Sequence, residues 1–68
     1  MTKLEAEIIV RLADNQLNVA EVARKMFMHR NSIVYHIKKV HRISGMNPLD
    51  FHDMCKLLPK AKVIIGRD

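Results

Sequence analysis

Residues 18–42, NVAEVARKMFMHRNSIVYHIKKVHR, decide the fold, because they combine two short helical patterns, a tight joint and most of the net charge. Asn18 is followed three residues later by Glu21, a spacing that predicts a helix start. The Asn18 side chain is expected to accept an amide of the first turn, and the Glu21 side chain to accept the amide of Asn18. One helix is then expected over 19–26 and a second over 30–44. Two short helices joined in this way predict a helix-turn-helix.

The apolar residues of this stretch lie where two crossing helices need them. Ala23 supplies the small residue in the middle of the first helix, over which the second helix crosses closely. The other residues expected to face inward are Val19, Val22, Met26, Ile33, Ile37, Val40 and Ser44. Phe27 and Met28 are expected to fill the space between the helices, while His29 or Asn31 caps the second helix and Gly45 ends it.

The positive charge of the chain is concentrated in this motif. Residues 18–46 carry six Lys and Arg side chains against one Glu, whereas the flanks 1–17 and 47–68 sum to −1 and +1. A basic segment favours a polyanionic partner, either nucleic acid or an anionic membrane surface. The polar residues that share the outer face of helix 30–44 are Asn31, Ser32, Tyr35, Lys38, Lys39 and Arg42. Such a helix is suited to the major groove of DNA.

The run MFMHRNSIVYHIKKVHRISGMN, residues 26–47, resembles the C-terminal DNA-binding domain of PucR-type and sugar-diacid-type transcriptional regulators, a helix-turn-helix group related to the Fis fold. The resemblance covers roughly residues 3–58. Family members usually show His-Arg-Asn-Thr-Leu-Arg-Tyr-Arg-Leu in the central part. The matching residues are His29, Arg30, Asn31 and Tyr35, with conservative changes at Ser32, Ile33 and Ile37.

Two residues depart from the family pattern. Val34 and His36 stand where the family usually has Arg, which removes two phosphate contacts and lowers the predicted affinity rather than changing the fold. By the resemblance, such domains belong to longer, dimeric regulators with an upstream sensory region. The chain is then either the C-terminal part of such a regulator or a small regulator that acts alone.

The chemistry of the side chains predicts their roles on DNA. Arg30 can bond guanine O6 and N7 together, Asn31 can bond adenine or cap the helix, and Ser32 can contact a base or a phosphate. The remaining side chains are expected to hold the backbone, with Asn18 and the nearby amides on a phosphate. The full predicted DNA-binding set is Asn18, His29, Arg30, Asn31, Ser32, Tyr35, His36, Lys38, Lys39 and Arg42.

A further helix is expected on each side of the motif, so that residues 1–68 form one all-α, four-helix domain of the homeodomain-like or Fis-like kind. The first covers about 2–14, with Thr2 as its cap and Leu4, Ile8 and Leu12 inward; Val10 lies off this stripe, on the surface or against another domain. The last covers about 48–58, capped by Asn47 and ended by Pro59, with Phe51, Met54, Cys55 and Leu58 inward. The tail 59–68 contains a β-like run at 63–65.

Other functional classes find little support. His52 and Cys55 lie one helical turn apart, but nothing nearby completes a metal site of three or four ligands. No cofactor or catalytic motif is present, so an enzyme is not expected. The single cysteine excludes an internal disulfide, and no apolar run approaches the roughly 20 residues of a membrane span. A cytoplasmic protein is expected.

Three functions therefore compete. The leading one is a sequence-specific transcriptional regulator that binds double-stranded DNA, expected as a homodimer. The first alternative is a protein-interaction or dimerisation module that uses Val10, Val34 and the 63–65 run. The second is a nucleoid-type protein that binds DNA without sequence preference.

Overall fold

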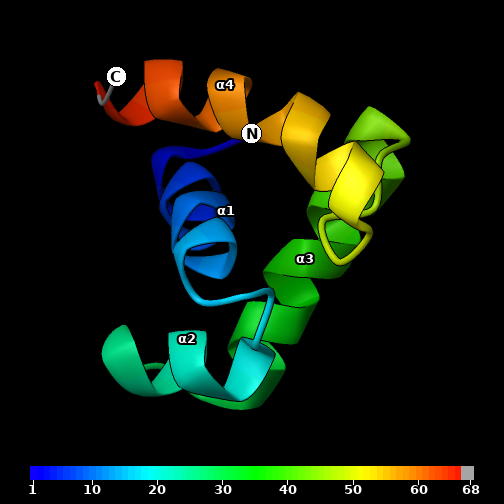
Figure 1. Cartoon of the computed structure of the whole chain (residues 1–68). Coiled ribbons are helices and arrows are strands. Elements are labelled where there is room, and N and C mark those ends of the chain that lie inside the picture. The colour runs from blue at the N-terminus through cyan, green and yellow to red at the C-terminus, as the bar shows by residue number, and fades with distance from the viewer. Residues whose placement is uncertain (67–68) are drawn as a thin grey trace.

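The computed structural model describes residues 1–66, and in this part of the chain it contains four helices and no strand (Figure 1). The helices are α1 (Lys3–Asp14), α2 (Val19–Lys25), α3 (Arg30–Ser44) and α4 (Phe51–Ile65). Figure 1 shows α4 across one end of the arrangement and α2 at the other, with α1 between them and α3 alongside. The all-α prediction is confirmed. None of the helices within residues 1–66 has the length and apolar content needed to cross a membrane.

α1 begins with a reciprocal cap. The hydroxyl of Thr2 accepts the amide of Glu5 at 3.1 Å, and the carboxylate of Glu5 accepts the amide of Thr2 at 2.9 Å. Both bonds satisfy amides that the first turn of a helix would otherwise leave open. The predicted N-cap at Thr2 is therefore confirmed.

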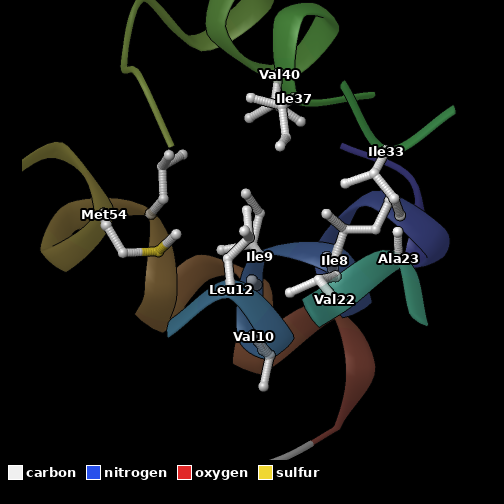
Figure 2. Close-up of a cluster of buried hydrophobic side chains, with 13 residues drawn as sticks. Ile8, Ile9, Val10, Leu12, Val22, Ala23, Ile33, Ile37, Val40 and Met54 are labelled. Atoms are coloured by element: carbon white, nitrogen blue, oxygen red, sulfur yellow. The ribbon is translucent and has the colours of Figure 1, made fainter. Parts of the chain in front are cut away.

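α1 is the central helix of the domain, and it is buried on more than one side. Ile8, Ile9 and Leu12 are fully buried, whereas Leu4, which was expected to face inward, is exposed. Val10 is only 1% exposed, so the prediction that it lies on the surface or against another domain is wrong. Figure 2 shows Val10 pointing away from the α3 side chains Ile37 and Val40. α1 packs against α2, α3 and α4, most extensively against α4, so more of its surface is buried than a single stripe predicts.

α4 begins three residues later than predicted. The side chain of Asn47 accepts the amide of Leu49 at 3.0 Å, which makes a local turn around Pro48 instead of a first helical turn. Asp50 caps the helix in place of Asn47, since its carboxylate accepts the amide of Asp53 at 3.0 Å. Asp53 in turn accepts the amide of Asn47 at 2.9 Å and fixes this turn to the helix.

α4 also continues through Pro59, so the predicted stop and the β-like run at 63–65 are both wrong. The buried residues Met54, Leu57 and Ala61 form one stripe on both sides of the proline, and Pro59 itself is exposed. Packing of this stripe offsets the backbone bond that proline cannot make. Phe51 and Cys55, which were expected inward, are exposed. Of the predicted tail 59–68, residues 67–68 lie outside the described part.

The joint between α1 and α2 is fixed by a buried amide. The side chain of Asn15 donates to the carbonyl of Arg11 at 2.7 Å and accepts from Lys25 Nζ at 2.6 Å. Lys25 is the last residue of α2, so one Asn side chain links the end of α1 to the far end of α2. α2 is thereby held against the end of α1.

Candidate nucleic-acid interface

The crossing of α2 and α3 is built as the sequence predicted. Ala23 and Val22 are buried on α2, and Ile33, Ile37 and Val40 are buried on α3. Figure 2 shows Ala23 and Ile33 next to each other in the core, where α2 packs against α3. α2 ends at Lys25, one residue before the predicted end, and α3 has the predicted bounds. A small residue at the crossing allows the two backbones to approach.

The turn between the two helices differs from the prediction. The amide of Met28 donates to the carbonyl of Ala23 at 3.0 Å, and that of Phe27 to the carbonyl of Arg24 at 3.3 Å. These are the two bonds of a Schellman motif, in which Phe27 takes the left-handed position with φ +54°. This conformation directs the ring outward, and Phe27 is 97% exposed instead of filling the space between the helices. Only Met28 packs against the core.

The first turns of α3 present polar side chains to solvent. α3 starts at Arg30, so His29 and not Asn31 is its N-cap residue, and the His29 side chain makes no capping bond. Arg30, Asn31, Ser32 and Tyr35 are exposed, as expected for residues that contact a ligand. No acidic residue lies in the first turn of α3, so the positive end of the helix dipole is not compensated. This end of α3 favours an anion.

The second half of α3 also carries exposed basic side chains. Lys38 and Arg42 are exposed on the same helix. The helix ends at Gly45, whose φ of +74° suits glycine. Ser44, which was expected to face inward, is exposed, and its hydroxyl donates to the carbonyl of Val40 at 2.6 Å and accepts the amide of Met46 at 3.1 Å. The hydroxyl therefore completes the helix end instead of the core.

Two predicted site residues have side chains that are already engaged inside the domain. His36 Nδ1 lies 3.1 Å from Glu5 Oε2, and Lys39 Nζ lies 3.4 Å from the same oxygen. Both residues are only partly exposed, in contrast to Lys38 and Arg42. The ten predicted residues thus divide into eight that are exposed and two that hold α3 to α1.

Glu5 is the functional-site residue that the sequence reasoning missed. Its side chain is 1% exposed. Burial alone would raise the pKa of Glu5, but the Thr2 amide, His36 and Lys39 together lower the pKa to about 2. A local signal existed in the spacing of Thr2 and Glu5, which fits a capping box and fixes the Glu side chain at the helix start. The contact with α3 had no such signal.

α2 begins with the predicted cap, in a different form. The side chain of Asn18 accepts the amide of Glu21 at 3.0 Å. The carboxylate of Glu21 does not reach back but bonds Arg24 on the same helix, and this contact lowers the pKa of Glu21. Asn18 remains exposed beside the α2–α3 pair. The pairing of Arg24 leaves the outer face of α3 as the main source of positive charge in the motif.

The candidate site offers no arrangement for a metal ion. Among residues 1–66, no three His, Cys, Asp or Glu side chains come together in a way that could hold one. His52 and Cys55 lie on α4, at the opposite end of the fold from α2. The chemistry of the exposed face of α3 is that of hydrogen-bond donors and positive charge.

Comparison with known protein families shows which family this arrangement of helices belongs to. Residues 7–59 match the model of the PucR C-terminal helix-turn-helix domain. Searches of curated proteins and of solved structures gave no match. The matched segment contains the whole of α2, the turn and α3, together with most of α1 and the first part of α4. The chain therefore belongs to the family of PucR C-terminal helix-turn-helix domains.

Proposed function

We propose that this domain binds double-stranded DNA at specific sequences and regulates transcription, with α3 lying in the major groove. One observation carries the proposal: the first turns of α3 expose Arg30, Asn31, Ser32 and Tyr35 while its opposite face is fixed on α1 and α2. A recognition helix needs such a rigid support, because base contacts depend on the register of each side chain. The family of the chain supports the same function.

The proposed roles follow the chemistry and exposure of each side chain. Arg30 bonds guanine through its two parallel donors, and Asn31 bonds adenine, since it is not needed as a cap. Ser32 contacts a base or a phosphate. Tyr35, Lys38 and Arg42 contact the DNA backbone and set the register, together with Asn18 and His29 at the helix starts.

His36 and Lys39 have a narrower proposed role than the other residues. Their contacts with the buried Glu5 fix the rotation of α3 about its own axis. Through this contact they position the residues that meet the bases. Lys39 keeps part of its side chain exposed and can still approach a phosphate.

Selection of bound sequences from a random DNA pool tests the proposal directly. A defined consensus is expected for the wild type, and Arg30→Ala should relax the preference at one base by about 1–3 kcal/mol. Lys56→Ala, an exposed position on α4, is the matched control and should leave the consensus unchanged. If Arg30→Ala weakens binding to all sequences equally, the domain is a nucleoid-type binder without sequence preference.

The same selection tests the expected homodimer. A dimer of helix-turn-helix domains requires two half-sites about one helical turn apart, so the consensus should be palindromic. A groove between the start of α1, the end of α3 and α4 exposes Met1, Ile43 and Ile64, which supports contact with a second copy. A single, non-palindromic half-site would contradict the dimer without contradicting DNA recognition.

The alternative function, a protein-interaction module, has less support than DNA binding. Val10, one of its expected contact residues, is buried between helices of the same domain. The 63–65 segment belongs to α4 and keeps Val63 and Ile64 exposed. A transcriptional regulator must reach DNA, which agrees with the expected cytoplasmic location. The proposed role requires neither a catalytic group nor a cofactor.

A further inference from the structure

The side chain of Phe27, in the turn between α2 and α3, does not pack against the core. Its backbone has φ +54°, and its side chain is 97% exposed. The position is the left-handed one of a Schellman motif, which favours glycine because an L side chain there is strained. A bulky ring at positive φ is uncommon. Folding alone would therefore favour Gly or Asn at this position.

The other two residues with positive φ among the described non-glycine residues show the contrast. Gln16 is polar and exposed, so its side chain suits water. Leu17 packs against the core, so its burial offsets the strain. Phe27 has neither a polar group in water nor a buried ring. Its phenyl group must then be explained by something outside the domain.

The surroundings of Phe27 indicate what that partner is. Lys25 precedes it, His29 and Arg30 follow it, and the sequence contains no acidic residue from 22 to 49. A protein partner would require a patch of several apolar side chains, but the neighbours Met26 and Met28 pack against the core. An isolated ring among basic side chains instead suits DNA, which offers apolar thymine methyl groups and deoxyribose rings between its phosphates.

We propose that Phe27 contacts DNA directly, with its ring against a thymine methyl group or a deoxyribose at the edge of the groove that Arg30 enters. The inference rests on the proposed function and adds a DNA-contacting residue that lies outside the recognition helix. Phe27 and Arg30 are three residues apart, with the N-cap of α3 between them. The rigid turn holds the ring at a fixed place relative to the base contacts.

Replacement of Phe27 by Gly and, separately, by Asn tests the inference, because both residues tolerate the left-handed backbone. The melting temperature should stay the same or rise, while affinity for the selected DNA site should fall about five- to tenfold, as expected for burial of roughly 50 Å² of ring surface. The salt dependence of binding should not change, since no charge is removed. The matched control is Phe51→Ala, which removes an exposed ring on α4 and should bind as the wild type does.

The outcomes separate this inference from the proposed function. Wild-type affinity in the Phe27→Gly and Phe27→Asn variants, or an equal loss in Phe51→Ala, overturns the Phe27 contact and leaves DNA binding intact. Failure of the wild type itself to bind any DNA overturns the proposed function. Replacing thymines by deoxyuridine one at a time distinguishes the two contacts: a methyl contact appears as a position where uracil weakens the wild type but not Phe27→Gly, and a deoxyribose contact shows no such position.

Discussion

Glu5 joins the start of α1 to the middle of α3 through one carboxylate. It accepts the Thr2 amide with one oxygen and faces His36 and Lys39 with the other. Such a buried charge contributes to stability only while its partners remain, because an isolated buried carboxylate is strongly disfavoured. The contact lies on the helix that we propose to read DNA, so loss of Glu5 should affect both folding and the placement of Arg30.

The pKa of Glu5 predicts how stability depends on pH. In the folded state the pKa is lowered from 4.5 to about 2. Glu5 therefore stabilises the fold fully above its ordinary pKa, and this contribution is lost as pH falls from about 4.5 to about 2. The loss should be of the order of 3 kcal/mol in the free energy of unfolding, measured by urea denaturation across this range.

Glu5→Gln should remove most of this pH dependence and destabilise the domain near neutral pH by about 1–3 kcal/mol. Glu7→Gln is the matched control, because Glu7 makes only a partly exposed ion pair with Arg11 at 3.5 Å. It should keep the pH dependence of the wild type. An unchanged acid transition in Glu5→Gln would show that other carboxylates control it.

The residues that the sequence predicted well are those whose environment is set by their own helix. Arg30 and Ser32 are exposed because the apolar positions Ile33 and Ile37 fix which face of α3 turns inward. The role of Glu5 was missed because its partners His36 and Lys39 lie far away in sequence, on α3. The burial of Val10 was missed because α1 packs against helices that are distant in sequence. Helical periodicity carries no information about a partner 31 residues away.

The predicted bounds of whole helices also depend on whether the signal is local or comes from distant parts of the chain. The bounds of α3 were correct, since Gly45 and the spacing of its apolar residues are local signals. The bounds of α4 were wrong at both ends. At its start, Asn47 and Asp50 are both good caps, and the turn around Pro48 decides between them. At Pro59, burial of Leu57 and Ala61 against the rest of the domain outweighs the local preference to stop.

Pro59→Ala should therefore stabilise α4. Alanine restores an amide that can donate to the carbonyl of Cys55, one turn earlier, and removes the clash of the proline ring with that carbonyl. Because Pro59 is exposed within the helix, the free energy of unfolding should rise, by up to about 3 kcal/mol, together with the melting temperature. Lys60→Ala, an exposed change on the same helix, should alter stability far less. A loss of stability in Pro59→Ala would contradict a continuous helix through this residue.

At the scale of the whole molecule, charge and burial are separated along the fold. α1 and α4 form the largest helix contact and supply most of the core, whereas the α2–α3 pair carries nearly all of the net charge. A domain of 68 residues buries only about 60% of the surface that its unfolded chain exposes, so a large part of its helix surface stays in contact with solvent. This leaves the outer face of α3 available for exposed polar side chains that the core does not need.

This separation predicts which charges govern the salt dependence of DNA binding. Each phosphate contact that is lost should reduce the slope of log affinity against log salt by about 0.9, so Lys38→Ala and Arg42→Ala should each lower it by about that amount. Lys56→Ala removes an equal charge from α4, outside the proposed interface, and should leave the slope unchanged. The measurement is fluorescence anisotropy with the selected duplex between about 50 and 200 mM salt. Equal effects of all three variants would mean that net charge alone attracts DNA, and a slope near zero in the wild type would instead favour an apolar protein interface.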